Sequence, residues 1–301
     1  MRVAVLMSTY NGEKYLKQQI DSILNQRGDF QLDLLIRDDG SNDNTISILE
    51  EYTQTNKIHY YIGNNLGPAY SFLDLLINSH NYDFYAFADQ DDYWMPNKIS
   101  VAISNLSNIK GPALYFANAE LVDSNLNSVG RNVYKKTPSL DLESLSCAGG
   151  VLGCTMIINA ELALAIQTKR KPHNVIMHDF YINELCLALN GTILYDPIPQ
   201  IKYRQHDSNV IGVSYRKLHT FKKRYYDIIS KPPISVSEQA KEIINLYKNE
   251  LNNEKIAWLI KIAKYHNNLF SRIALACSMK TKYINKNMGL KIRLSILLGN
   301  R

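Results

Sequence analysis

Strand and helix signals alternate from the first residues of this chain, and this alternation restricts the possible folds more than any other feature. Short apolar runs predict strands at residues 3–7, 32–36, 58–62 and 84–88. Apolar side chains at helical spacing predict the intervening helices at residues 14–26, 45–52 and 69–78. A βαβαβαβ order predicts an α/β fold, in which helices flank both faces of a mostly parallel, Rossmann-like sheet.

Polar segments follow three of these predicted strands, at the point where each strand ends. They are residues 10–12 (Tyr-Asn-Gly), 38–41 (Asp-Asp-Gly-Ser) and 89–92 (Asp-Gln-Asp-Asp). In open α/β sheets, ligands bind at the carboxyl ends of the strands. We therefore expect these three segments to meet at one edge of the sheet and to form a ligand site there.

Residues 89–92 place three carboxylates in four positions, directly after a strand that should be buried. Such carboxylates repel one another and resist desolvation. A divalent cation relieves both costs, because Mg²⁺ and Mn²⁺ prefer oxygen ligands and usually also hold a phosphate. The alternative is a solvated acidic turn ahead of the next helix. No P-loop and no Gly-x-Gly-x-x-Gly segment follows the first strand, so phosphate binding would fall to a metal, which favours the metal site.

Asp38 and Asp39 also allow two interpretations. They could cap the helix that follows. Alternatively, a carboxylate at the mouth of the sheet could accept a hydrogen bond from the N–H of a pyrimidine base. Together with a metal site at residues 89–92, the second interpretation points to a nucleoside diphosphate as the ligand.

The charge of the chain is distributed unevenly. Of its 301 residues, 46% are hydrophobic and 21% are charged, as in an ordinary globular protein. Residues 1–200 contain 14 Lys and Arg against 22 Asp and Glu, whereas residues 201–301 contain 20 against 6. This split predicts an acidic catalytic body and a basic tail that meets an anionic surface.

The cysteines and the apolar runs bear on the compartment. The four cysteines form no Cys-x-x-Cys pair, which argues against a zinc site or a disulfide framework and fits a reducing cytosol. No secretory signal is visible, and no run reaches the roughly 18 apolar residues that a membrane span requires. We therefore expect a soluble or peripheral protein.

The alternation loosens after residue 118. A Gly-rich loop at residues 149–153 precedes a predicted strand at 155–159, and a helix is predicted at 178–189. Beyond residue 215 the pattern is basic, with helices predicted at residues 215–229, 237–252 and 254–279. We expect one domain at residues 1–214, with a nucleotide-binding half at about 1–118 and an acceptor half at about 119–214, followed by a basic helical extension at 215–301.

In combination, these motifs resemble the family 2 glycosyltransferases of the GT-A fold, over roughly residues 1–215. The matching segments are residues 8–13 (Ser-Thr-Tyr-Asn-Gly-Glu), 38–45 (Asp-Asp-Gly-Ser-Asn-Asp-Asn-Thr), 65–67 (Asn-Leu-Gly), 88–94 (Ala-Asp-Gln-Asp-Asp-Tyr-Trp) and 178–179 (His-Asp). The chain looks most like bacterial rhamnosyltransferase-type enzymes of surface polysaccharide assembly. These often contain Asp-Gln-Asp-Asp-x-Trp and a later Gln-His-x-x-Asn-x-x-Gly, here at residues 205–212.

The resemblance implies a role for each motif residue. The nucleotide would contact Thr9, Tyr10, Asn11, Glu13, Asp39 and Asp89. A Mn²⁺ or Mg²⁺ ion would be held by Asp89, Asp91 and His206. The donor sugar or the acceptor would contact Asp92, Trp94, Gly150 and His178. Asp179 would be the catalytic base that deprotonates the acceptor hydroxyl in an inverting transfer.

Some of these assignments have alternatives. Asp179 also suits a helix N-cap, Trp94 equally suits a core aromatic, and a lone histidine such as His206 is more often a surface or core residue than a ligand. Two other functions are compatible with the fold. A sugar nucleotidyltransferase would carry a Gly-rich segment after the first strand, which is missing here, and a non-catalytic scaffold would have lost the carboxylates that are present here.

The resemblance therefore implies a metal-dependent, inverting glycosyltransferase of bacterial O-antigen or capsule synthesis. Its donor would be dTDP-rhamnose or a UDP-hexose, and its acceptor a saccharide or lipid-linked oligosaccharide. Residues 215–226 interleave cations with aromatic side chains, which favours an anionic membrane surface over a solvated helical face, and no recognition motif supports nucleic acid. We expect a cytoplasmic protein, peripheral on the inner face of the bacterial membrane.

Overall fold

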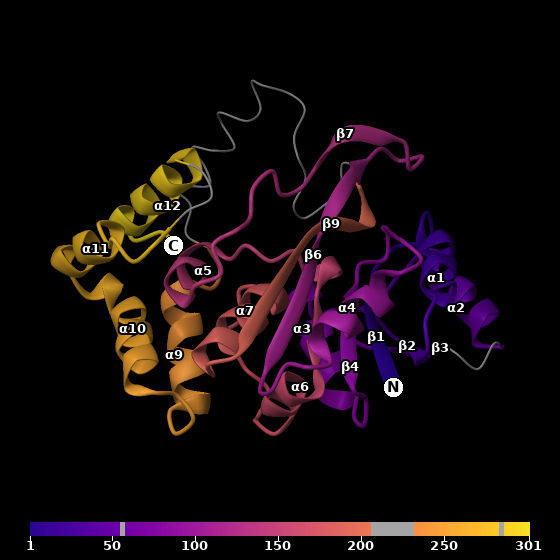
Figure 1. Ribbon diagram of the computed structural model, residues 1–301, viewed down its shortest axis with the longest axis horizontal. Coiled ribbons are helices and arrows are strands. Elements are labelled where there is room, and N and C mark those ends of the chain that lie inside the picture. The colour runs from indigo at the N-terminus through magenta and orange to yellow at the C-terminus, as the bar shows by residue number, and fades with distance from the viewer. Residues whose placement is uncertain (55–57, 206–231, 283–285) are drawn as a thin grey trace.

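The computed structural model describes residues 1–54, 58–205, 232–282 and 286–301. Within these ranges the chain forms a nine-stranded sheet flanked by helices, and further helices extend the molecule at one end (Figure 1). Among the described residues, no helix is both long and apolar enough to cross a membrane. The architecture confirms the predicted α/β fold class with its C-terminal helices.

One short antiparallel strand, β8 (Ile157–Asn159), lies between two parallel parts of the sheet. The strands are β1 (Arg2–Thr9), β2 (Gln31–Asp38), β3 (Ile58–Ile62), β4 (Phe84–Ala88), β5 (Tyr93–Trp94), β6 (Ala113–Val122), β7 (Ser128–Asn132), β8 (Ile157–Asn159) and β9 (Thr192–Arg204). Their order is β3-β2-β1-β4-β8-β6-β9-β5, with β7 paired to β6. The first four strands are parallel to one another, and β8 pairs antiparallel with both β4 and β6. The strand β6 and its parallel neighbour β9 therefore run in the same direction as the first four strands.

The helices fall into a sheet-flanking group and a C-terminal group. The first group is α1 (Leu16–Leu24), α2 (Thr45–Thr53), α3 (Pro68–Asn78), α4 (Lys98–Leu106), α5 (Leu142–Ala148), α6 (Ala160–Gln167) and α7 (His178–Ala188). The second group is α9 (Val236–Tyr247), α10 (Asn253–Ala263), α11 (Leu269–Ala276) and α12 (Lys286–Leu298). Short 3-10 turns lie at Gly153–Thr155 and Tyr265–Asn267.

Both faces of the central strands are buried, which explains their continuous apolar sequence. Ala4 and Leu6 of β1 belong to one core with α3, α6 and α7, whereas Val3, Val5 and Met7 belong to a second core with α1, α2 and α4. All five residues of β4 are buried. The predicted limits of β3 and β4 match the structure to the residue.

The C-terminal helices pack onto the first core and extend it. Residues of α9, α10, α11 and α12 share this core with α5 and α7. The single helix predicted at residues 254–279 is wrong, because α10 ends at Ala263 and α11 begins at Leu269. Asn268 is extended between them, and its side chain accepts a hydrogen bond from the Ser271 N–H, so it caps a new helix. The helix predicted at 215–229 lies outside the described residues.

Candidate active site

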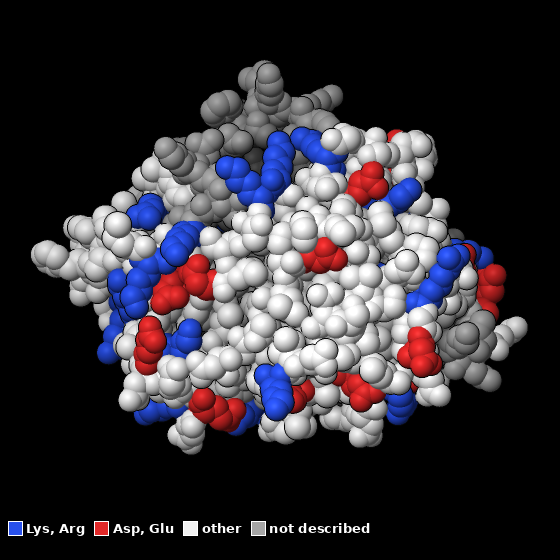
Figure 2. Space-filling view, viewed as in Figure 1, with Lys and Arg blue, Asp and Glu red and all other residues white. Residues whose placement is uncertain are grey.

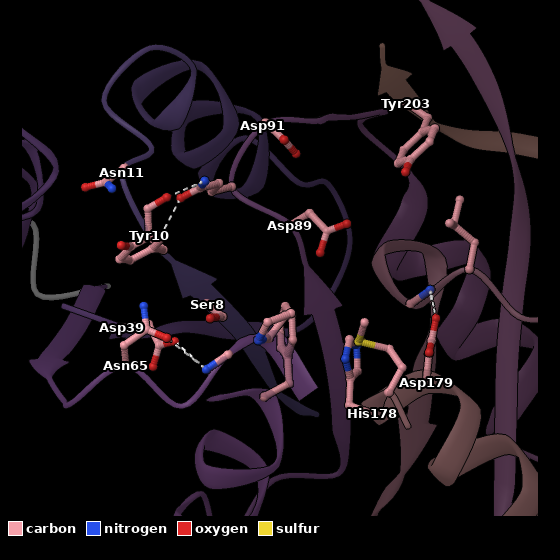
Figure 3. A pocket seen from close by; sticks show the side chains of 17 residues that line it. Ser8, Tyr10, Asn11, Asp39, Asn65, Asp89, Asp91, His178, Asp179 and Tyr203 are labelled. Carbon is pink, nitrogen blue, oxygen red and sulfur yellow. Dashed lines mark hydrogen bonds between the residues drawn. The ribbon is translucent and has the colours of Figure 1, made fainter. Parts of the chain in front are cut away.

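A pocket of about 600 Å³ opens at the carboxyl ends of β1, β2 and β4 (Figure 3). On one side lies the loop wall, formed by residues 8–12, 38–45 and 65–68, and on the other lies the helix wall, formed by residues 152–153, 177–179 and Tyr203. The lining residues are Ser8, Tyr10, Asn11, Asp39, Asn65, Gly67, Pro68, Phe72, Asp89, Gln90, Asp91, Leu152, Gly153, Met177, His178, Asp179 and Tyr203. The fold thus brings together most of the motif residues that the sequence indicates.

In the loop wall, the segments after β1 and β2 are tied to each other by hydrogen bonds. The Asn11 N–H donates to Ser41 Oγ at 2.8 Å, and the Asn42 N–H donates to Asn11 Oδ1 at 2.8 Å. The backbone and side-chain N–H groups of Asn44 both donate to the Glu13 carboxylate. Glu13 therefore holds the second loop in place, and it does not line the pocket.

Thr9 and Asp38 lie buried beneath these loops. Thr9 Oγ1 donates to Asp38 Oδ1 at 3.0 Å, and the N–H groups of Gly40 and Ser41 donate to Asp38 Oδ2 at 3.1 and 2.8 Å. The pair thus fixes the turn after β2. Thr9, which the resemblance implies as a nucleotide contact, does not line the pocket.

Gln90 connects the acidic turn after β4 to the loop after β1. The Tyr10 N–H donates to Gln90 Oε1 at 2.9 Å, and Gln90 Nε2 donates to the Tyr10 carbonyl at 3.0 Å. A Cβ at position 12 would lie 2.2 Å from Gln90 Oε1, so a residue other than glycine there would displace the Gln90 side chain and break this bridge. The bridge fixes the backbone of Tyr10, whose exposed ring lies at the pocket (Figure 3).

The carboxylate of Asp39 organises the loop between β3 and α3. It accepts hydrogen bonds from the N–H of Leu66 at 2.9 Å and from the N–H of Gly67 at 2.8 Å, and it is paired with the buried guanidinium of Arg37. Asp39 also lines the pocket, where Figure 3 shows it next to Asn65. It can therefore shape the loop and face a ligand at the same time.

Asp89 and Asp91 lie in the turn after β4 and line the pocket between its two walls (Figure 3). Burial raises the pKa of Asp89 to about 7, and the negative charges of Asp91 and Asp179 raise it further. A cation placed among these carboxylates would relieve their repulsion. The pair Asp89 and Asp91 offers only oxygen ligands toward the pocket, which fits a hard divalent cation.

A second group of possible metal ligands lies deeper. A carboxylate oxygen of Asp89, a carboxylate oxygen of Asp92 and the Sγ atom of Cys154 all lie within 4.8 Å of one another. Burial raises the pKa of the Cys154 thiol well above its usual value, which keeps the thiol protonated. Because hard cations prefer oxygen ligands, this group fits Mn²⁺ or Mg²⁺ less well than Asp89 and Asp91 do.

Asp92 and Trp94 are buried behind the pocket and do not line it, so the structure gives neither of them the expected contact with donor or acceptor. Asp92 Oδ1 accepts a hydrogen bond from the Arg204 N–H at 3.1 Å. Lys98 Nζ lies 3.3 Å from the centroid of the Trp94 ring, and burial lowers the lysine pKa to about 7. Trp94 is thus a core aromatic, because β5 pairs with β9 at this point.

Asp179 belongs to the helix wall, in the first turn of α7. Its Oδ1 accepts the Phe180 N–H at 2.6 Å, and its Oδ2 accepts the Gly153 N–H at 3.1 Å. Burial raises the pKa of Asp179 to about 6, although both N–H groups act in the opposite direction. The N-cap of α7 is Met177, so the alternative of Asp179 as N-cap is wrong. A carboxylate with this pKa can accept a proton near neutral pH.

His178 lies next to Asp179 and is buried although it lines the pocket. Neither ring nitrogen has a hydrogen-bond partner within the described part of the chain. The ring packs against Phe72 and Phe87, with centroid distances of 4.1 and 5.4 Å, and burial lowers its pKa to about 3. The imidazole is therefore neutral and offers one donor and one acceptor to a ligand. Gly153 permits this packing, because a Cβ there would lie 2.7 Å from His178 Nε2.

Gly150 and His206 are two further residues that the resemblance implies at the site. Gly150 is outside the pocket, and its carbonyl accepts a hydrogen bond from the Tyr134 hydroxyl at 2.8 Å. His206 lies outside the described residues. The described strand before it ends at the acidic turn, because Arg204 Nε donates to the Asp91 carbonyl at 2.7 Å.

Several lining residues have no role assigned from the sequence. Ser8 and Asn65 stand inside motifs that match the family, so a signal for them existed. Phe72, Met177 and Tyr203 come from α3, the approach to α7, and β9. No local pattern marks these three, because only the packing of distant elements brings them to the pocket.

The fold has the architecture of the GT-A glycosyltransferases. Residues 4–131 match the model of glycosyl transferase family 2. This match confirms the resemblance seen in the motifs over that part of the chain. The chain is also 29% identical over 241 residues to the dTDP-rhamnosyl transferase RfbG of Shigella flexneri, a match that covers 73% of this chain and 80% of that protein.

Two solved structures share the fold. Residues 1–349 of S. aureus TarS, in complex with UDP-GlcNAc, align over 99% of this chain and 90% of that chain, with a TM-score of 0.55 and 15% identity. The mannosyltransferase PcManGT from Pyrobaculum calidifontis, in complex with GDP-Man and Mn²⁺, aligns over 99% and 86%, with a TM-score of 0.52 and 15% identity. At these identities the likeness concerns the fold alone.

Proposed function

We propose that this glycosyltransferase is inverting and moves a sugar from a nucleoside diphosphate sugar to a hydroxyl of a saccharide or lipid-linked oligosaccharide. The observation that carries the proposal is a single pocket in which Asp89 and Asp91 lie between the nucleotide-side loops and Asp179 (Figure 3). Carboxylates that bind the metal and diphosphate would then lie on one side of the anomeric carbon. A carboxylate that accepts the proton would lie on the other side.

The loop wall suits the nucleotide part of the donor. The Tyr10 ring is available to contact a base, while Asn11 and Asp39 supply polar groups beside it. Phe72 and Met177 present apolar surface deeper in the pocket, which suits the methyl group of a 6-deoxyhexose. This lining and the similarity to a dTDP-rhamnosyl transferase favour dTDP-rhamnose as the donor over a UDP-hexose.

Asp89 and Asp91 would hold a Mn²⁺ or Mg²⁺ ion, with His206 as a further ligand. Their position in the pocket supports this assignment, as does the Mn²⁺ in the structure of PcManGT. The support for His206 is its position in the sequence. It follows Arg204 by two residues, and Arg204 contacts the acidic turn. When bound, the cation would offset the negative charge on the leaving diphosphate.

Asp179 would act as the catalytic base. The hydroxyl of the acceptor gives its proton to the Asp179 carboxylate while its oxygen bonds to the anomeric carbon, and the bond from that carbon to the diphosphate breaks. The hydrogen bonds from Phe180 and Gly153 hold the carboxylate in place. The neutral His178 beside it would hydrogen-bond a hydroxyl of the donor sugar or of the acceptor.

The similarity to a known transferase suggests a biosynthetic pathway for this protein, and the proposed acceptor suggests its location in the cell. Similarity to a dTDP-rhamnosyl transferase supports a role in bacterial O-antigen or capsule synthesis. Lipid-linked acceptors lie at the cytoplasmic leaflet, where anionic lipids attract polybasic segments. The basic region at 215–301 would hold the protein peripherally on the inner face of that membrane.

The test is nucleotide release from a panel of sugar nucleotides, measured with purified protein and added Mn²⁺ or Mg²⁺. We expect release from dTDP-rhamnose to exceed release from UDP-glucose and UDP-GlcNAc, and to increase when a saccharide acceptor is added. Asp179→Asn is the matched control, because it keeps the pocket but lacks the base. Equal release by this variant, or release from none of the donors, would contradict the proposal.

A further inference from the structure

Helices α11 and α12 each expose a stripe of large apolar side chains. On α12, Leu290, Leu294 and Leu298 recur every fourth residue, so they lie on one face of the helix, and all three are exposed. On α11, Leu269, Phe270 and Ile273 are exposed, and Phe270 is 85% accessible. Clusters of exposed large apolar side chains mark interaction surfaces.

The opposite faces of the two helices are anchored in the protein. Leu275 of α11 and Ile292 and Ile296 of α12 are buried in the first core. Arg293 of α12 donates a hydrogen bond to the Ala276 carbonyl at the end of α11, at 2.6 Å. The exposed stripes therefore belong to two helices held against each other and against the body of the protein.

The same part of the chain carries positive charge without acidic residues. After Glu254 the sequence contains ten Lys and Arg and no Asp or Glu. Lys280 is near Glu143 at 3.7 Å and Glu254 at 3.9 Å, while Lys264 and Lys282 are exposed residues beside the two helices. Figure 2 shows Lys and Arg at the end of the molecule where Figure 1 places α11 and α12, with acidic side chains next to them.

We propose that α11 and α12 form a docking face that lies on an anionic lipid bilayer, with Phe270, Leu290 and Leu294 inserted between the headgroups. This inference deepens the membrane contact proposed above and rests on it, but not on the chemistry of the pocket. Apolar insertion and attraction of cations to anionic lipid act together in helices that lie in the interface. At 13 residues, α12 is about 20 Å long, too short to cross a hydrocarbon core of about 30 Å.

The charge pattern favours a bilayer over a second copy of the chain. Two copies facing each other through these helices would bring the exposed Lys264 and Lys282 of each copy together, while Glu143 and Glu254 already lie near Lys280. An anionic bilayer supplies both the negative surface and the apolar layer that this face lacks. The bilayer is therefore the occupant that complements both properties.

The experiment is co-sedimentation of the full chain with vesicles of phosphatidylcholine, with and without phosphatidylglycerol. The test variant is Phe270→Gln combined with Leu294→Gln, which should bind anionic vesicles about tenfold more weakly because two inserted side chains are lost. The matched control is Leu164→Gln combined with Ile198→Gln, which replaces residues of 58% and 64% exposure on α6 and β9 and should bind as the wild type does. Lys264→Gln combined with Lys282→Gln should also weaken binding, and added salt should weaken it in every variant.

The outcomes separate this proposal from its alternatives. Unchanged vesicle binding by the α11–α12 variant, or equal binding of the wild type to neutral vesicles, would overturn it. If the wild type self-associates in sedimentation velocity, the variant does not, and neither binds vesicles, the occupant is a second copy. Nucleotide release should persist in all three variants, so a failure of the reaction would be seen separately from a failure of docking.

Discussion

The two walls of the pocket differ in how their polar groups are satisfied. In the loop wall, Asn11 forms hydrogen bonds to the loop after β2, and the backbone of Tyr10 forms hydrogen bonds to Gln90 of the acidic turn. In the helix wall, both ring nitrogens of His178, which lines the pocket, are without hydrogen-bond partners in the described part of the chain. Burying such groups costs stability unless a ligand pairs them. The loop wall is therefore preassembled, whereas the helix wall keeps buried polar groups available.

This contrast predicts different consequences of substitution. Changes in the loop wall should lower stability and weaken donor binding, because they break bonds within the protein. Loss of the His178 nitrogens in the helix wall should lower turnover with little loss of stability, because their partners come with the substrates. Asp89 and Asp91, between the walls, should affect both binding and turnover.

Loss of the divalent cation should have the largest effect, because it leaves the charge of the diphosphate and of Asp89 uncompensated. Chelation with EDTA should reduce turnover by about 10³ or more, and Mn²⁺ or Mg²⁺ should restore it. Asp91→Asn should raise the cation concentration needed for half-maximal activity. Asp29→Asn, at an exposed site outside the pocket, is the control. Full activity of Asp91→Asn in EDTA would show that no metal is held there.

Asp179→Asn should lower kcat by about 10² or more, with a much smaller change in the KM for the donor. Because only the ionised carboxylate accepts a proton, the wild-type kcat should rise with pH through about 6 and then level off. This rise should be absent from the residual rate of the variant. Steady-state kinetics from about pH 5 to 8 measure both effects. Near-normal turnover in Asp179→Asn would place the base elsewhere.

His178→Leu should lower kcat/KM by about tenfold, as expected for the loss of one hydrogen bond to a substrate. Its thermal unfolding should stay close to that of the wild type, because the replaced nitrogens have no hydrogen-bond partners within the described residues. His178→Gln, which restores a polar atom, should recover part of the activity. An unchanged kcat/KM in the leucine variant would mean that His178 serves only to pack against Phe72 and Phe87.

Gln90→Leu tests the loop wall. It removes both hydrogen bonds to the Tyr10 backbone, so the free energy of unfolding should fall by about 1–2 kcal/mol and the KM for the donor should rise several-fold. The change in kcat should be smaller than the change in KM. Gln31→Leu, at the exposed start of β2, is the control. If Gln90→Leu lowers kcat but leaves KM and stability unchanged, the proposed difference between the loop wall and the helix wall is wrong.

A further expected effect concerns stability alone. The pKa of Asp179 is about 6 in the folded protein and lies above the ordinary value of 3.8, so wild-type stability should fall as pH rises from about 4 to 6. The amide introduced by Asp179→Asn does not titrate. The stability of this variant relative to the wild type should therefore improve over the same range, by on the order of 1–3 kcal/mol. Urea unfolding at several pH values measures this difference, and a pH-independent difference would contradict the effect of burial.

Burial on both faces made the first half of the fold predictable from sequence. The run that became β4 matched because a strand between two helical layers leaves a continuous apolar signal. The edge strand β3 is largely exposed, and its isoleucine and tyrosine residues gave the strand signal there. The break between α10 and α11 was not predicted, because it depends on Asn268 acting as a cap within an otherwise helical pattern. Local periodicity does not show which of several suitable residues ends a helix.

The site was predictable at the level of motifs and less so for individual side chains. Tyr10, Asp89 and His178 line the pocket as the motifs indicate. Thr9 and Glu13 stand in the same motif as Tyr10, yet their side chains bind neighbouring loops. A motif locates a loop at the pocket, but contacts between loops decide which of its side chains face the ligand.

Arg204, at the end of β9, binds segments that are made much earlier in translation. Its side chain donates to Gln18 Oε1 and to the carbonyls of Asp91 and Ser124, and its backbone N–H donates to Asp92. These partners lie 80 to 186 positions away in sequence, so each contact closes a long loop of chain. A chain still emerging from the ribosome lacks this anchor for its acidic turn until β9 has been made. The ability to bind a sugar nucleotide should thus appear abruptly, near the end of translation of the catalytic region.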